Sequence, residues 1–178
     1  MKTSQYKEAK RLFTECLEIL QKTHGANHPQ TISIMTSLAL VYEKQNKPLN
    51  QVEAISKECL AKSIVIIGKD HPDTLSAMNN LAVCYRNQGK FYEAEKLWKE
   101  CLDKHKKILG IDHIDTLGVI FNLGFSFEQK GEVEQALPFY QECYNKRCVV
   151  LGRDHVDTLS CAERIDSINK LIVNQIIN

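Results

Sequence analysis

The sequence predicts an all-α protein of the α-solenoid class, a right-handed superhelix of antiparallel helix pairs with about eight helices. Two independent residue types recur with one period, since histidines and cysteines both return after 43, 42 and 42 residues. These markers are His28, His71, His113 and His155, and Cys16, Cys59, Cys101 and Cys143. Apolar residues between the markers follow helical spacing, and glycines interrupt them. A fixed period of this length is typical of stacked helical repeats.

Each unit is predicted to contain two helices of about 15 residues, or about 22 Å, separated by a tight turn. The apolar face of the first helix in the second unit consists of Leu75, Met78, Leu81, Ala82 and Tyr85. Gly89 breaks this helix, because glycine is the usual residue just past a helix end. The apolar face of the second helix consists of Phe91, Ala94, Leu97, Trp98, Cys101 and Leu102.

The joints between units look like small functional sites, because each contains glycine, histidine and a hydroxyl. Their sequences are GANHPQT (25–31), GKDHPDT (68–74), GIDHIDT (110–116) and GRDHVDT (152–158). A role in ending one helix and starting the next explains these residues better. Gly68 is expected to end one helix, Asp70 or His71 to cap the next, and Pro72 to occupy its first position. Neighbouring units stack about 10 Å apart, too far for successive joint histidines to share a metal ion.

The units divide the chain into five segments of one array. One residue is inserted between Tyr42 and Cys59, and we place it near Pro48. The segments are a lone second helix in 4–25, full repeats in 28–68, 71–110 and 113–152, and a terminal lone first helix in 155–178.

The segment NNLAVCYRNQGKFYEAEKLWKECL (79–102) resembles the tetratricopeptide repeat. The matching residues are Leu81, Ala82, Tyr85, Gly89, Phe91, Ala94, Trp98 and Cys101. The third unit matches through Leu123, Gly124, Phe127, Gly131, Ala136, Tyr140 and Cys143. The period of about 42 residues and the LGxDHPDT joint resemble the kinesin light chain subgroup. In the first full unit, Ser56 replaces the aromatic residue, which predicts looser packing there.

Bulk properties exclude several classes of partner. With 23 Lys and Arg against 22 Asp and Glu, no charge excess indicates nucleic acid or an anionic membrane. No apolar run approaches the roughly 20 residues of a membrane helix, and the start lacks the apolar stretch of a signal peptide. The seven cysteines contain no C-x-x-C pair, so we expect reduced thiols in a cytoplasmic protein.

The motifs of common enzymes are missing from the sequence. We find no P-loop, dinucleotide glycine motif, G-x-S-x-G or H-E-x-x-H, and therefore expect neither catalysis nor a cofactor. Cys101 and His105 form an i, i+4 pair that would supply half a zinc site. The repeat instead places Cys101 at a small buried position shared with Cys16, Cys59 and Cys143, so we expect no metal.

The first helix of each unit is expected to line a concave groove that binds a peptide. The groove residues predicted by the register are Thr36, Leu40 and Lys44, then Ser76, Asn79, Val83, Arg86 and Asn87, and then Phe121, Phe125 and Gln129. Asn79 and Arg86 suit a peptide main chain and an acidic side chain. The two phenylalanines suit an apolar anchor. Arg86 and Lys44 are equally consistent with solvated charges, and the phenylalanines with core packing.

The sequence therefore predicts a non-enzymatic scaffold or adaptor that binds a segment of a partner protein. The resemblance to kinesin light chains implies aromatic–acidic peptides as one class of partner. Two alternatives remain. In the first, the array self-associates through its terminal helices, which light scattering over a concentration range would reveal. In the second, the chain is the sensor segment of a larger signalling NTPase, whose P-loop would lie outside these residues.

Overall fold

The computed structural model describes residues 2–45 and 48–177, except for the side chains of 2–4, 43–44 and 175–177. These residues form α-helices and no strand, in agreement with the predicted all-α class. The helices are α1 (Lys2–Thr23), α2 (Pro29–Lys44), α3 (Leu49–Ile67), α4 (Pro72–Asn87), α5 (Phe91–Ile108), α6 (Ile114–Gln129), α7 (Val133–Val150) and α8 (Val156–Ile177).

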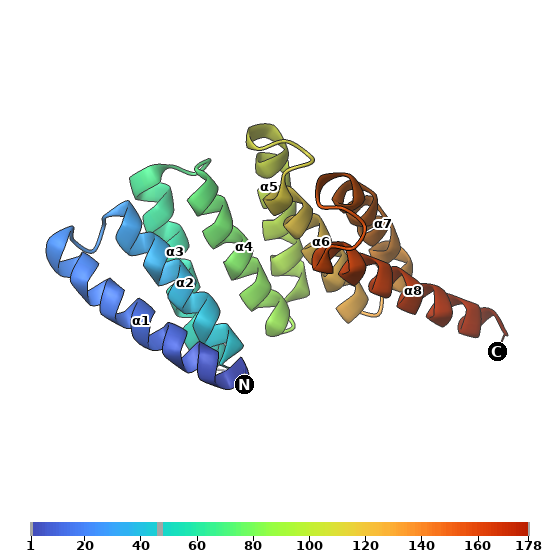
Figure 1. Ribbon diagram of the computed structural model, residues 1–178, viewed down its shortest axis with the longest axis horizontal. Helices are drawn as coiled ribbons and strands as arrows, with labels where there is room; N and C mark the ends of the chain where they lie inside the picture. The colour runs from blue at the N-terminus through green and yellow to red at the C-terminus, as the bar shows by residue number, and fades with distance from the viewer. Residues whose placement is uncertain (1, 46–47, 178) are drawn as a thin grey trace. The chain divides into compact units, whose positions relative to one another are not determined.

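The chain divides into two compact units, Met1–Leu97 and Trp98–Asn178. In the first unit, α1 packs against α2, α2 against α3, and α3 against α4. Helices α2 and α4 also contact each other, so two first helices lie side by side (Figure 1). In the second unit, α7 packs against both α6 and α8. In the repeats formed by α2 with α3 and by α6 with α7, the first helix therefore meets its second helix, as the alternating apolar faces predict.

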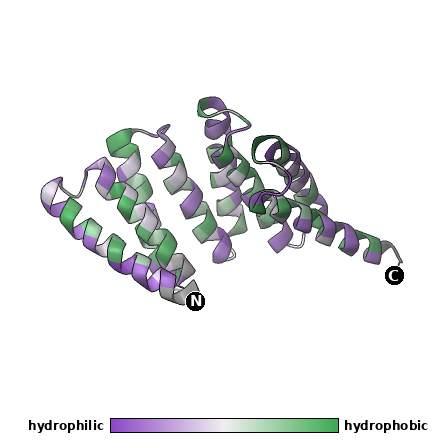
Figure 2. Ribbon diagram, viewed as in Figure 1, coloured by the Kyte–Doolittle hydropathy of each residue, from purple (hydrophilic) through white to green (hydrophobic). Residues whose placement is uncertain are grey.

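The predicted apolar faces are buried. In the first unit, the core residues of α4 include Leu75, Met78, Leu81 and Ala82, each 5% exposed or less. In the second unit, Phe127 on α6, Ala136 and Tyr140 on α7, and Ile168 on α8 form one cluster. Hydrophobic and hydrophilic residues alternate along each helix (Figure 2), because one face of each helix packs and the other is solvated.

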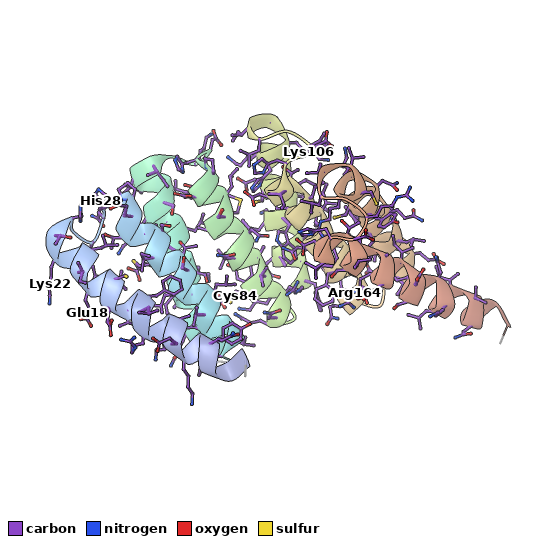
Figure 3. The ribbon with its side chains drawn as sticks, viewed as in Figure 1. Glu18, Lys22, His28, Cys84, Lys106 and Arg164 are labelled. Atoms are coloured by element: carbon purple, nitrogen blue, oxygen red, sulfur yellow. The ribbon has the colours of Figure 1, made fainter. Side chains whose placement is uncertain are left out.

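The joints end one helix and cap the next, as the sequence predicts. His71 caps α4, since its Nδ1 accepts a hydrogen bond from the Asp73 amide at 3.1 Å, and Asp70 does not act as the cap. The same bond recurs at the other joints, at 3.3 Å from Gln30 to His28, 3.2 Å from Asp115 to His113, and 3.1 Å from Asp157 to His155. Figure 3 shows His28 between α1 and α2.

The joint threonine has a role that the sequence analysis missed. Thr74 Oγ1 donates to the Gly68 carbonyl at 2.7 Å and so ties the start of α4 to the end of α3. Thr31 and Thr116 make the equivalent bonds at 2.9 and 2.8 Å. Gly68 itself has φ +93°, a left-handed conformation that glycine adopts without steric cost.

The inserted residue of the first full unit falls in the turn within the repeat. Four residues, 45–48, separate α2 from α3, whereas three residues separate α4 from α5 and α6 from α7. Pro48 is the N-cap residue of α3. The first helices α2, α4 and α6 each have 16 residues, so the extra residue lies between α2 and α3.

The expected burial of Cys16 is wrong. Cys59, Cys101 and Cys143 are buried, but Cys16 on α1 is exposed. Cys59 and Cys143 each face the first helix of their own repeat. Cys59 contacts the Thr36 hydroxyl on α2, and the Cys143 thiol donates a hydrogen bond to a carbonyl on α6. Helix α1 packs against α2, which is the first helix of the next repeat.

Candidate binding surface

The predicted groove residues of the first unit lie on the outward faces of α2 and α4. Leu40 on α2 and Ser76 and Asn87 on α4 are exposed, and the remaining described ones are half-buried, namely Thr36, Asn79, Val83 and Arg86. The side chain of Lys44 lies outside the described residues. Half-buried polar side chains of this kind can be covered by a partner without loss of the packing beneath them.

A hollow of about 230 Å³ lies where α2, α3 and α4 meet. Three of the predicted residues, Thr36, Leu40 and Ser76, line it. The other lining residues are Pro29, Ile32, Ser33, Ser37, Ser63, Ile67, Asp73 and Asn80. Asn79, Val83 and Arg86 are not among its lining residues, so the predicted residues of α4 divide between this hollow and the rest of the helix face.

The hydroxyl groups of the hollow are committed in a particular way. Thr36 Oγ1 donates its proton to the Ile32 carbonyl at 3.0 Å, and Ser37 Oγ donates to the Ser33 carbonyl at 3.1 Å. Both oxygens can therefore only accept hydrogen bonds from a bound group. Ser63 Oγ is fully buried and has no hydrogen-bond partner in the described structure. A buried hydroxyl of this kind is costly unless something pairs with it.

Arg86 already interacts with its neighbour in the chain. Its Nε and Nη2 donate to Asn87 Oδ1 at 3.2 and 3.0 Å. A partner carboxylate would have to replace this amide oxygen, which is a favourable exchange because a charged acceptor binds guanidinium more strongly than a neutral one. Asn79 lies seven residues earlier, so both side chains belong to one helical face.

The predicted apolar anchor on α6 takes part in core packing in the second unit. Phe121 and Phe125 are half-buried and pack against the cluster of Phe127, Ala136, Tyr140 and Ile168. The Arg147 guanidinium lies 5.1 Å from the centroid of Phe121, and that of Arg164 lies 4.8 Å from the centroid of Phe125. Figure 3 shows Arg164 on α8. These contacts correspond to the core-packing alternative, and Gln129 at the end of α6 is exposed.

Glu128 on α6 is held by two neighbours. Its carboxylate accepts a hydrogen bond from the Tyr140 hydroxyl at 2.6 Å and pairs with Arg164 at 3.0 Å. Burial raises the pKa of Tyr140 well above its usual range, and the hydrogen bond to the Glu128 carboxylate raises it further. The group therefore ties together α6, α7 and α8 as a neutral tyrosine bound to a carboxylate.

The Cys101–His105 pair is a buried structural contact. Its Sγ and Nδ1 atoms are 3.2 Å apart, and the same Nδ1 lies 2.9 Å from the Cys101 carbonyl, so the ring nitrogen is the donor. Burial raises the pKa of Cys101 to about 12, which is unsuited to a nucleophile. Within the part of the chain that the structure describes, no three potential metal ligands come together.

One buried thiol differs from the others. A hydrogen bond with Cys143 and the nearby Arg147 guanidinium lower the pKa of Cys161 to about 7, against the effect of burial. Arg147 Nη1 lies 3.4 Å from this sulfur. Cys161 is fully buried on α8, so solvent reagents do not reach it in the folded chain. The sequence analysis did not select it, because Cys161 lies outside the repeating cysteine series.

Comparison with known proteins identifies the family. The family model described as tetratricopeptide repeat matches residues 1–49 and 73–148, more than half of the chain. The chain belongs to the tetratricopeptide repeat family. No curated protein matches the sequence. Repeats of this family form protein–protein interaction scaffolds and are generally non-catalytic. In the described residues, none of the helices combines the length and apolar character needed to cross a bilayer.

Solved structures share the fold of this tetratricopeptide repeat protein. A kinesin light chain-type protein of Podosopora anserina with nearly identical TPR-like repeats has a TM-score of 0.72 and 20% identity, covering 95% of this chain and 80% of its own. A variant of that protein gives a TM-score of 0.73. BtubC (BKLC) from P. vanneervenii has a TM-score of 0.78 and 19% identity, covering 95% of this chain and 67% of its own. The resemblance to kinesin light chain-like repeats is thus confirmed at the level of fold.

Proposed function

We propose that this protein is a non-catalytic scaffold that binds an extended segment of a partner protein on the surface formed by α2 and α4. The observation that carries the proposal is the contact between these two first helices, with a hollow of about 230 Å³ beside it. The surface offers the mixture that peptide binding needs, since apolar Leu40 and Val83 lie among polar side chains.

The polar side chains of α4 suit different parts of a bound peptide. Asn79 has both a donor and an acceptor, which suits the main chain of an extended peptide. Arg86 suits an acidic side chain of the same peptide, because guanidinium and carboxylate form two parallel hydrogen bonds. The tetratricopeptide repeat family supports this mode of action, because its repeats form protein–protein interaction scaffolds.

Two substitutions test the proposal. A partner is first captured with the wild-type chain, and its affinity is then measured by calorimetric titration. We expect Asn79→Ala to weaken binding by about 1–3 kcal/mol, because a polar group of the partner loses its hydrogen bond. Arg86→Glu should weaken it further and reduce its sensitivity to salt, since an attractive charge contact is lost.

Matched controls are available on α7 and in the last joint. Asn145→Ala and Arg153→Glu make the same chemical changes at exposed positions of the second unit. They should leave affinity unchanged, and all four variants should keep the helicity and melting temperature of the wild type. Equal affinity of Asn79→Ala, Arg86→Glu and the wild type would place the binding surface elsewhere on the chain.

A further inference from the structure

We propose that the hollow between α2 and α4 is a subsite for the guanidinium group of an arginine side chain on a bound protein. The inference rests on the proposed function, since both use the surface of these two helices. Three observations support it: the hydrogen-bonding character of the lining, its single charge, and the way the same chain fills the equivalent position in the second unit.

The lining presents acceptors to a bound group. Thr36 and Ser37 have spent their hydroxyl protons on carbonyls of α2, and each has an oxygen left to accept. Ser63 lines the hollow, and its Oγ is buried without a hydrogen-bond partner in the described structure. A guanidinium group has five N–H donors and no acceptor, so it complements this lining. Donors are fewer in the lining, and they come from Ser33, Ser76 and Asn80, so a carboxylate or phosphate would match it less well.

The charge of the hollow is negative. Asp73 is the one charged residue among its described lining residues, and its side chain is 56% exposed. His71 Nδ1 lies 3.9 Å from the Asp73 carboxylate and accepts a hydrogen bond from the Asp73 amide. The Asp73 carboxylate is thus the acidic group that a cationic ligand would meet in the hollow.

The internal repeat shows which group fits such a position. Ser63 precedes Asp73 by ten residues, and Arg147 precedes Asp157 by the same ten. In the second unit, the Arg147 side chain is buried, its guanidinium lies 5.1 Å from the Phe121 centroid, and Nη1 donates to the Asp157 carbonyl at 2.8 Å. The chain thus places its own guanidinium group where α7 meets α6 and α8.

The first unit lacks both of the side chains that fill this position. Ser63 stands in place of Arg147, and Thr36 stands in place of Phe121. Both replacements are much smaller, which explains why a hollow of about 230 Å³ remains there. Its apolar lining residues are Ile32, Leu40 and Ile67, which suit the methylene stem of an incoming arginine. Arginine is favoured over lysine because guanidinium is planar and more weakly hydrated.

The direct test is an NMR titration of the full ¹⁵N-labelled chain with N-acetyl-L-argininamide. The neutral isostere N-acetyl-L-citrullinamide is the control ligand. We expect saturable shifts of the Ser63, Asp73 and Ser76 amides with the arginine compound alone. Asp73→Asn should weaken this binding about tenfold, the loss of one charge-assisted contact. Asp115→Asn changes the matching acid at the start of α6, 57% exposed beside its own capping histidine, and should leave it unchanged.

A second variant tests the equivalence with Arg147. Ser63→Arg should supply the guanidinium from within the chain, keep the far-UV spectrum of the wild type, and abolish binding of argininamide. The proposal is overturned by absence of saturable shifts at the hollow, by equal binding of citrullinamide, or by a Ser63→Arg chain that unfolds or binds argininamide normally. If argininamide fails while partner binding still depends on Asn79, the proposed function stands without this subsite.

Discussion

At the scale of single residues, the four joint histidines act as helix caps. Each one accepts a hydrogen bond from the amide two residues later, at 3.1–3.3 Å. This bond satisfies one of the amides that a helix leaves unpaired in its first turn. The combination of histidine, acid and hydroxyl in each joint is therefore explained without a ligand or a reaction.

The cap at His113 gives a quantitative prediction. His113→Ala removes the acceptor at the start of α6 and should lower the free energy of unfolding by about 1 kcal/mol, the usual loss for a cap. His113→Asn should restore most of it, because asparagine is a good capping residue. Urea denaturation measures both. Equal losses in the two variants would mean that the ring contributes by packing and not by capping.

Residues at repeating positions were predictable only where their surroundings also repeat. Cys59, Cys101 and Cys143 are buried as the period predicts, but Cys16 on α1 is exposed. The hollow around Ser63 was not predicted, although its cause lies in the sequence. Ser63, His105 and Arg147 occupy one repeat position, and serine is much smaller than histidine or arginine.

At the scale of helices, the approach of α6 to α7 depends on Gly124. A Cβ atom added there would lie 3.1 Å from Phe139 Cβ and 3.3 Å from the Tyr140 ring. Tyr140 is fully buried and its hydroxyl is bound by Glu128, so the ring has little room to move. Gly118 lies on the same helix, and a Cβ atom there would meet nothing within 4 Å.

One substitution at these two glycines should therefore have opposite effects. Gly118→Ala should raise the free energy of unfolding by about 0.5–1 kcal/mol, because alanine loses less backbone entropy in a helix. Gly124→Ala gains the same term but overpacks the α6–α7 contact, at a cost of about 1–3 kcal/mol, and should be destabilising on balance. Thermal and urea unfolding compare the two variants. An equal gain in both would show that the helices separate easily at Gly124.

Helices were easier to predict than the contacts of their outward faces. The apolar spacing and the glycines predicted an all-α chain of about eight helices, and the described residues form α1 to α8. The register also placed Phe121 and Phe125 on the outer face of α6, where the structure shows them under Arg147 and Arg164. Those two arginines belong to α7 and α8, and the residue spacing within α6 alone does not predict side chains that come from other helices.

At the scale of the whole molecule, the repeat predicts the class of activity but does not identify the partner. The 42-residue period predicts stacked helix pairs, and the family is one of interaction scaffolds. We propose that partner choice depends on a few side chains of α4, such as Asn79 and Arg86, which are not part of its buried face. Large apolar residues are also exposed on α1 and α8, including Ile19 at 60% and Val173 at 52%, so self-association through these helices stays a prediction.

Site-specific photocrosslinking tests most directly whether α2 and α4 form the binding surface. The photoreactive residue p-benzoylphenylalanine replaces Ser76, exposed on α4, and in separate chains Val65 on α3 or Val149 on α7, which are 84% and 86% exposed. After irradiation with the captured partner, we predict a crosslinked product from position 76 and none from 65 or 149. Crosslinks from 65 or 149 with none from 76 would contradict binding on the first helices.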